Sequence, residues 1–240
     1  KEKRMKAEVK VLNRKAQESE KMKQAFINSI CHEIRTPLNS IVGFSDLIMN
    51  EDIDEEMRRE FPAEIQKSTL LLTGLVNSML EVANLDVSED KLPCGPTDIR
   101  NICIQEMEKI SPKPRIKYQL DITEDTLFIP TNAQYLTMVI EHLLNNANKF
   151  TEEGFIALGY KVNLSKNQIC ISVTDSGCGI PKEKQEEVFN RFSKLDTFVP
   201  GNGLGLYLCR LIVKRLDGEI KIDPEYTDGT RVVVNLPMNE

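Results

Sequence analysis

The chain has 240 residues, of which 40% are hydrophobic and 28% are charged. This length and composition are typical of one medium-sized globular domain or of two small ones. The net charge of -6 argues against a nucleic-acid-binding protein, and no apolar run is long enough to span a bilayer.

The six cysteines form no CxxC pair or other metal-ligand spacing; they lie at positions 31, 94, 103, 170, 178 and 209. We interpret them as reduced thiols of a cytosolic protein. The chain opens within a helical pattern and lacks an initiator Met. This start indicates a piece of a larger protein, whose other parts can include a membrane anchor.

Residues 1 to about 25 are charged, lack Gly and Pro, and carry apolar residues at the spacing of a coiled-coil seam, namely Val9, Leu12 and Ala16. A solvated, fraying helix would have the same composition. We favour a coiled coil that continues into the next helix, because no breaker separates the two segments.

The next segment, Phe26 to Leu38, has the sequence FINSICHEIRTPL and contains His32. Apolar residues recur there at every fourth position and predict a slowly drifting helical stripe: Met22, Phe26, Ile30, Ile34 and Leu38. His32 lies about 200° around the helix from Ile30 and Ile34. We therefore expect it to face solvent, with Glu33 beside it and Thr36 one turn on.

An exposed His beside a carboxylate is a usable nucleophile, because imidazole is largely neutral at cell pH and a carboxylate can accept its second N–H. Taken alone, however, an exposed His on a helix is usually a surface residue. Pro37 lacks an N–H and clashes with the preceding turn, at a cost of about 3 kcal/mol. We expect it to interrupt the helix and to introduce a bend.

A polar, acidic break from Asn50 to Asp54 precedes a second amphipathic helix. Its apolar positions follow a heptad in which Ser68 fills one polar slot: Phe61, Ile65, Leu72, Leu75, Met79 and Val82. Two such helices joined by a short loop form an antiparallel hairpin. One hairpin cannot cover both stripes, so we expect a homodimer that forms a four-helix bundle.

The Pro- and Gly-rich segment Leu92 to Pro96 predicts a linker, and an alternation of helices and strands follows it. Thr97 or Asp98 should cap a helix that ends near Ile110, and Thr131 or Asn132 should cap a helix to about Asn148. A third helix is expected over 204–216. Alternating apolar residues predict strands near 116–122, 156–162 and 169–173. Two closing strands are expected near 219–222 and 230–236, and together these elements make an α/β sandwich.

The helix HLLNNANKFT carries three polar residues at i, i+4 and i+7, which share one face: His142, Asn146 and Lys149. An Asn carbonyl is a hard oxygen ligand for Mg²⁺, and a Lys can meet phosphate as a point charge. A plain polar helix face would carry the same residues. Three Asn in four positions are nevertheless unusual within a helix.

The segment VTDSGCGIP, residues 173–181, continues the strand parity of the preceding apolar residues, so Asp175 should face the interior. A buried carboxylate needs a donor, and an adenine exocyclic amine would be one. Gly177 and Gly179 allow the backbone to turn and to approach a flat ring. An ordinary strand-to-loop turn is the alternative.

A third motif, GNGLGL at 201–206, leads directly into a helix, whose N-terminal N–H groups favour phosphate. A single GxGxG motif is weak evidence. Between the two glycine motifs lies VFNRFSK, residues 188–194, followed by a stretch long enough for a mobile lid. Arg191 and Lys194 could reach a terminal phosphate from there.

The chain resembles the sensor histidine kinase family over essentially its whole length. The resemblance rests on five segments in this order: HEIRTPL, the Asn-rich helix, DSGCGIP, the phenylalanine-containing segment VFNRFSK and GNGLGL. The resemblance implies an α+β protein in which a dimeric helical bundle precedes an ATP-binding domain of the kind found in gyrase and Hsp90. The implied parts are a signalling coiled coil (1–25), a dimerisation and phosphoacceptor domain (26–91), a linker (92–97) and a catalytic ATP-binding domain (98–240). The fragment would then be cytoplasmic, and its parent could be an inner-membrane sensor.

The resemblance also implies roles for single residues. His32 would be phosphorylated, Glu33 would act as its acid/base partner, and Thr36 would orient water during dephosphorylation of a partner. Arg191 would offset charge on the γ-phosphate, Asn146 would hold Mg²⁺ and Asp175 would bind adenine N6. The full set expected to contact ATP is His142, Asn146, Lys149, Asp175, Gly177, Gly179, Ile180, Lys194, Gly201, Gly203, Leu204, Gly205, Leu206 and Thr230.

Three positions depart from the family pattern. Cys31 stands where Ser is usual, and Asp217-Gly218 where paired glycines are common. His142 stands where these kinases have the first Asn of their motif, and imidazole is not a preferred Mg²⁺ ligand.

The expected reaction is in-line phosphoryl transfer from ATP to His32 and onward to an aspartate of a response-regulator receiver domain. Two alternatives remain open. One is an ATP-driven clamp, which requires a carboxylate base one turn before Asn146, where the chain has His142 and where Glu141 points about 100° away. The other is a non-enzymatic scaffold with a vestigial nucleotide site.

Overall fold

The computed structural model describes residues 2–49, 54–87, 92–123, 125–193 and 203–238. Several predictions lie outside the described residues: the loop at 50–53, Lys194, Gly201, and the side chains of Val9, Leu12, Ala16 and Met22. The described chain forms two compact units that divide at Asn77 and Ser78. None of its described helices is long and apolar enough to cross a membrane.

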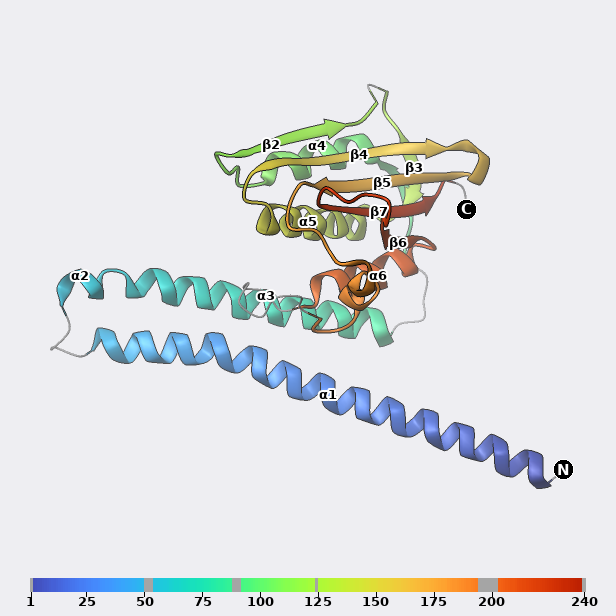
Figure 1. Ribbon diagram of the computed structural model, residues 1–240, viewed down its shortest axis with the longest axis horizontal. Helices are drawn as coiled ribbons and strands as arrows, with labels where there is room; N and C mark the ends of the chain where they lie inside the picture. Colours follow the sequence, from blue (N-terminus) through green and yellow to red (C-terminus); the bar gives the residue numbers. More distant parts are fainter. Residues whose placement is uncertain (1, 50–53, 88–91, 124, 194–202, 239–240) are drawn as a thin grey trace. The chain divides into compact units, whose positions relative to one another are not determined.

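The first unit is helical. It contains α1 (Glu2–Ile48), the short α2 (Glu55–Arg58) and α3 (Phe61–Val87), which continues into the second unit. In Figure 1, α1 and α3 run antiparallel beside each other, and the rings of Phe44 and Phe61 meet with centroids 5.5 Å apart. The predicted hairpin and the uninterrupted passage from residues 2–25 into the His32 helix are therefore confirmed.

The predicted stripe of α3 is also confirmed. Phe61, Ser68, Leu75 and Val82 are buried, and the remaining members of the heptad are half-buried. The apolar residues that flank the stripes stay exposed: Leu38 and Val42 on α1, and Leu71 and Val76 on α3. The hairpin thus buries one face of each helix and leaves apolar margins uncovered.

Two predictions for α1 are wrong. Pro37 does not interrupt the helix, which continues to Ile48, although Figure 1 shows its axis changing direction part-way along. The ring of Pro37 is buried, and this packing offsets the missing hydrogen bond. Leu38, the fifth member of the predicted stripe, is 44% exposed, because steps of four residues advance about 40° each and carry it away from α3.

The second unit is a two-layer α/β sandwich. Its five-stranded sheet has the order β2-β4-β5-β7-β6, in which only the β2–β4 pair is parallel. The strands are β2 (Ile116–Asp121), β4 (Gly154–Asn163), β5 (Gln168–Asp175), β6 (Glu219–Ile222) and β7 (Thr230–Pro237). All five strands were predicted, and β2, β4 and β5 were predicted from their alternating patterns.

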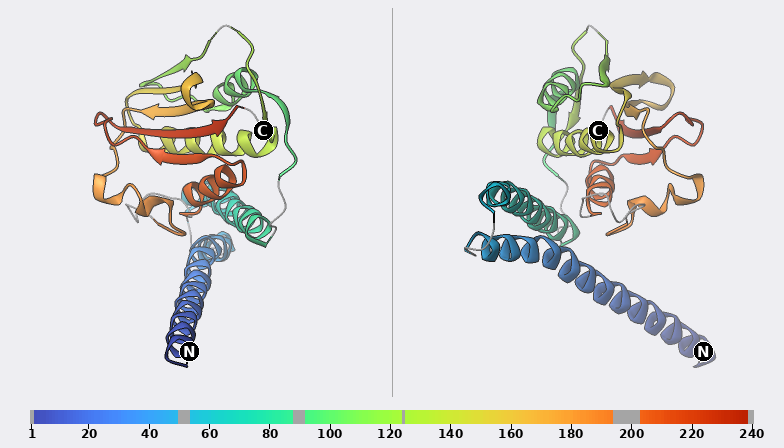
Figure 2. Two further views of the ribbon diagram at one scale, coloured as in Figure 1. Left: turned by 90° about the vertical axis from the view of Figure 1, so that its right-hand side faces the viewer. Right: turned by 60° about the vertical axis from the view of Figure 1, so that its left-hand side comes forward.

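Three helices cover one face of this sheet, as Figures 1 and 2 show: α4 (Ile99–Lys109), α5 (Ala133–Phe150) and α6 (Gly205–Arg215). Asp98 caps α4 by accepting a hydrogen bond from the Asn101 N–H, and Asn132 caps α5 by accepting one from Tyr135. The inward strand residues Ile169, Ile171 and Val173 pack against α5 and α6 in one apolar core. Short 3₁₀ turns, η1 (Leu164–Lys166), η2 (Lys182–Lys184) and η3 (Glu187–Phe189), occur in the connections.

The predicted linker over 92–97 is partly wrong, because β1 (Gly95–Asp98) pairs with β3 (Phe128–Thr131) in a separate two-stranded sheet. Neither strand was predicted. Pro96 and Pro130 stand opposite each other in this sheet, and proline normally argues against a strand. Both strands are edges, however, so the missing N–H groups cost no central hydrogen bond.

Candidate functional site

The carboxylate of Asp175 lies at the end of β5 and is only 6% exposed. Its Oδ1 accepts hydrogen bonds from the N–H of Gly177, at 2.9 Å, and from the N–H of Thr230, at 3.1 Å. Burial raises the pKa of this carboxyl, and the two backbone donors partly offset that effect. Among the described residues, Oδ2 accepts no hydrogen bond and is therefore available to a ligand's N–H.

Glycine is required on both sides of this carboxylate. A Cβ on Gly177 would overlap the carbonyl oxygen of Phe150, and a Cβ on Gly229 would overlap that of Asp175. Gly229 also has a φ of 148°, which side chains rarely adopt. These glycines let three segments close around Asp175: the end of β5, the loop after it and the start of β7.

The polar face of α5 belongs to the same unit as this site, and the carbonyl oxygen of Phe150, at the end of α5, lies against Gly177. His142 and Asn146 are half-buried and one turn apart, and neither side chain forms a hydrogen bond with another described residue. Burial lowers the pKa of His142, whereas Glu141 acts in the opposite direction. The ammonium of Lys149 lies 4.6 Å from the ring centroid of Phe150.

The N-terminus of α6 lies next to His142, whose Nδ1 is 3.6 Å from the position that a Cβ on Gly205 would take. Leu204 is the N-cap residue, and its apolar side chain is fully buried and caps nothing. The side chain of Leu204 is therefore not accessible to a ligand, whereas Leu206 is half-buried. The first N–H groups of α6 have no intrahelical acceptor and favour an anion.

The remaining predicted residues fall at the edges of this region. Gly179 faces the carbonyl oxygen of Gly229, and Gly203 lies against the backbone of Phe192. Ile180 packs on the apolar core. The guanidinium of Arg191 lies 4.7 Å from the ring centroid of Tyr207, on α6.

His32 lies in the other unit, on α1. Its side chain is 76% exposed, and its Nδ1 is 3.9 Å from Oε1 of Glu33. Thr36 donates a hydrogen bond from Oγ1 to the carbonyl oxygen of His32, at 3.3 Å. The prediction that His32 faces solvent beside a carboxylate is confirmed.

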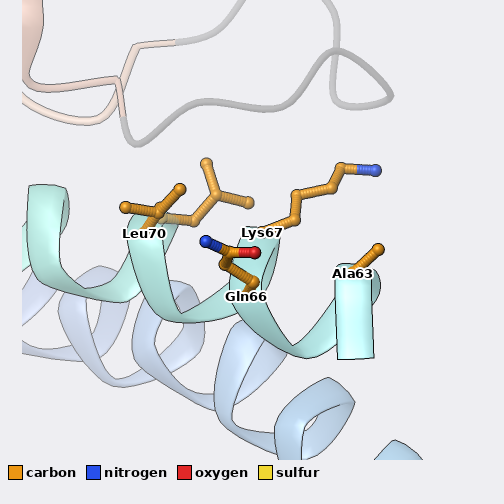
Figure 3. A pocket seen from close by; sticks show the side chains of 5 residues that line it. Ala63, Gln66, Lys67 and Leu70 are labelled. Atoms are coloured by element: carbon orange, nitrogen blue, oxygen red, sulfur yellow. The ribbon is translucent and has the colours of Figure 1, made fainter. Parts of the chain in front are cut away.

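A shallow depression on α3 is a separate feature, shown in Figure 3. It contains none of the predicted site residues, and its lining consists of Ala63, Gln66, Lys67, Leu70 and Leu71. Among the described residues, no group of three or more His, Cys, Asp or Glu side chains could hold a metal ion.

Two family models match the chain in the order of its two units. Residues 22–87, which include His32, match the His Kinase A (phospho-acceptor) domain. Residues 131–240, which include Asp175, match the histidine kinase-, DNA gyrase B- and HSP90-like ATPase. The chain belongs to the two-component sensor histidine kinases. It carries the catalytic core of a protein-histidine kinase, with a helical phosphoacceptor region followed by an ATP-binding α/β domain.

Individual relatives agree with this assignment. The kinase is 29% identical to the hybrid signal transduction histidine kinase A of Dictyostelium discoideum, over 92% of this chain and 11% of that protein. It is 28% identical to the sensor histidine kinase GacS of Pseudomonas protegens, over 96% of this chain and 26% of that protein. The chain thus spans only a minor part of the length of the curated relatives that it matches.

Among solved structures, full-length ShkA in complex with AMPPNP is 26% identical and has a TM-score of 0.65, over 89% of this chain and 45% of ShkA. The kinase ThkA, in complex with the response regulator protein TrrA, has a TM-score of 0.70 over 94% of this chain and 64% of that one, at 21% identity. At this identity, the similarity to ThkA is a similarity of fold.

Two residues near Asp175 were not predicted. Tyr226 donates a hydrogen bond from its hydroxyl to the backbone carbonyl oxygen of Asp175, at 3.2 Å, and Gly229 supplies the close approach described above. The pattern Asp228-Gly229-Thr230 before a strand was a signal for the glycine. No local pattern signals Tyr226, because its partner lies 51 residues away.

The raised pKa of Asp175 predicts how the kinase without nucleotide responds to pH. The folded state binds the carboxyl proton more tightly than the unfolded state, so this group stabilises the fold at low pH and loses that contribution as pH rises through its folded pKa. In Asp175→Asn, the amide oxygen can still accept both backbone hydrogen bonds without a charge. The variant should therefore be at least as stable as wild type at pH 7, and its advantage should shrink toward pH 4.

Thermal unfolding of both proteins between pH 4 and 8, without nucleotide, measures this difference. A variant that is less stable than wild type at pH 7 would show that the charged carboxylate is a structural requirement of the fold.

Proposed function

We propose that this kinase transfers the γ-phosphoryl group of ATP to His32 and then passes it to an aspartate of a response-regulator receiver domain. The observation that carries the proposal is the pairing of two sites in one chain: an exposed imidazole beside a carboxylate on α1 and a buried carboxylate with a free oxygen in the ATP-binding domain. The first suits a nucleophile, and the second suits an adenine amine.

In the nucleotide site, Oδ2 of Asp175 would accept a hydrogen bond from the exocyclic N6 amine of adenine. Gly177, Gly179 and Ile180 would line the ring, and Thr230 would lie beneath it. The glycine motif, with Gly201, Gly203 and Gly205, would place backbone N–H groups around the phosphates at the N-terminus of α6. Lys149 and Lys194 would add positive charge there.

Asn146 would hold Mg²⁺ through its amide oxygen, which is a hard ligand and accepts no hydrogen bond from the other described residues. When bound, Mg²⁺ offsets negative charge on the phosphates. Arg191 would contribute further positive charge near the γ-phosphate. Its present place over the ring of Tyr207 keeps the guanidinium beside α6.

At the phosphoacceptor, the position of Glu33 beside Nδ1 of His32 leaves Nε2 as the attacking atom. The Nε2–P bond forms as the bond between the γ-phosphorus and the bridging oxygen of ATP breaks, and ADP leaves. Glu33 can then accept the Nδ1 proton from the positively charged ring. Catalysis thus consists of positioning and charge neutralisation.

The onward step would return the imidazole to its starting state and phosphorylate a receiver aspartate. Thr36, one turn from His32, would orient water when the same surface dephosphorylates the receiver.

We place the kinase core in the cytoplasm because it uses ATP and because its six cysteines are all free thiols. An ATP-driven clamp is disfavoured, because His142 occupies the position where such an enzyme needs a carboxylate.

The exposed apolar margins of the helical unit support a homodimer. Leu38 and Val42 lie one turn apart on α1, and Leu71 and Val76 lie on the two sides of the buried stripe of α3. A second hairpin would cover these residues and complete a four-helix bundle. Such a dimer would leave His32 exposed, because it lies on the opposite side of α1 from Ile30 and Ile34.

The phosphoacceptor assignment predicts a labelling result. Incubation with Mg²⁺ and γ-labelled ATP should give protein-bound label that survives alkali and is lost in acid. His32→Gln should carry no label, because Gln has a similar size but no nucleophilic nitrogen, and it should bind ATP as wild type does. Acid-stable label, or label retained in the variant, would contradict the assignment of His32.

The adenine assignment predicts a binding defect in Asp175→Asn. An amide in this position can direct its NH₂ group at the adenine amine, which leaves a buried donor unpaired. Such a donor costs about 1–3 kcal/mol of binding free energy, so the Kd for ATP should rise roughly 5- to 150-fold. Calorimetric titration with ATP measures the change, and thermal unfolding verifies that the variant is folded. ATP affinity equal to that of wild type would remove Asp175 from the adenine pocket.

The dimer assignment predicts that Val42→Asp dissociates the protein. A carboxylate without a partner would be buried in the bundle, which should raise the dimer dissociation constant at least about tenfold. Leu164→Asp is a matched control, because Leu164 is 84% exposed in the other unit. Sedimentation of both variants over a concentration series tests this, and a monomeric wild-type protein would contradict the proposal.

A further inference from the structure

His142 is the one residue of the nucleotide site whose chemistry does not match the ion that the site is expected to hold. Mg²⁺ prefers oxygen ligands and octahedral geometry, whereas imidazole nitrogen suits first-row transition metals. The chain has only two histidines, and the other one lies on α1. The position of His142 therefore decides whether the imidazole can reach the metal that accompanies ATP.

The geometry brings His142 to that metal's proposed position. His142 and Asn146 are at i and i+4 on α5, so their Cβ atoms are about 5–6 Å apart on one face. The same spacing lets two helical side chains bind one metal ion in metalloproteases. Neither side chain forms a hydrogen bond with another described residue, so neither has to give up such a bond to bind a cation.

The environment of the imidazole points the same way. Its Nδ1 lies next to Gly205 at the start of α6, where the phosphates are proposed to bind. Glu141, the charged group that affects His142, is exposed and lies on a different face of α5. The imidazole thus lies beside the region where the phosphates are proposed to bind, and the one carboxylate that acts on it among the described residues lies on another face of the helix.

We propose that His142 is a direct ligand of the divalent cation bound with ATP, an inference that rests on the proposed function. A mixed set of one imidazole nitrogen, the Asn146 amide oxygen and phosphate oxygens favours a transition-metal ion such as Mn²⁺ over Mg²⁺. His142 is then a specificity-determining residue for the metal, and replacing it with Asn should restore a preference for Mg²⁺.

The direct test uses the whole chain with ¹⁵N-labelled histidine, Mn²⁺ and the non-hydrolysable analogue AMPPNP at natural abundance. Pulsed electron paramagnetic resonance detects ¹⁵N coupled to Mn²⁺, and the label separates imidazole from adenine nitrogen. Wild type should show the coupling. It should disappear in His142→Asn and persist in His32→Gln, which removes the only other labelled residue.

A second readout is the affinity for AMPPNP, measured with Mn²⁺ and with Mg²⁺. Loss of even an outer-shell partner costs about 10–100-fold in metal affinity, so the ratio of the two affinities should fall at least about tenfold in His142→Asn. Thermal unfolding of the variant verifies its fold.

AMPPNP binding without ¹⁵N coupling, or coupling that survives in His142→Asn, would overturn the inference and leave the proposed function intact. Failure of AMPPNP to bind with either ion would overturn the proposed function, and the inference with it.

Discussion

The ATP-binding domain depends on one constraint, which is that a buried carboxylate must be hydrogen-bonded. Asp175 meets it by accepting two backbone N–H groups through a single oxygen, and this leaves the other oxygen for a ligand. The glycines on both sides follow from the same constraint, because any side chain at Gly177 or Gly229 would push the donor segments away. The fold thus retains the carboxyl group of Asp175 although burial disfavours its charged form. Such locally unfavourable groups often occur at binding sites.

The two histidines of the kinase have opposite environments, and this difference separates their proposed roles. His32 is exposed on a helix, with a carboxylate next to one ring nitrogen, so its other nitrogen can approach a phosphorus atom. His142 is half-buried beside the N-terminus of a helix, where it can reach the phosphates and their metal ion. One imidazole is thus proposed to receive the phosphoryl group, and the other to bind the metal ion at the site that supplies it.

Local patterns in the sequence predicted most of the fold and the main features of the site. The caps at Asp98 and Asn132, the heptad of α3 and the inward parity of Asp175 each depend on residues within a few positions of one another. The failures involve distant partners. Pro37 stays helical because its ring is buried, the β1–β3 pair joins segments about 30 residues apart, and Tyr226 reaches Asp175 across 51 residues. No local period carries such information.

The most direct test of the account is a nuclear magnetic resonance measurement of the histidine side chains after incubation with Mg²⁺ and ATP at alkaline pH. Because the chain has only two histidines, ¹⁵N labelling gives a spectrum in which each can be assigned by substitution. The account predicts that Nε2 of His32 acquires a coupling to ³¹P and that His142 does not. A coupling on His142, or none on either ring while ATP is bound, would contradict it.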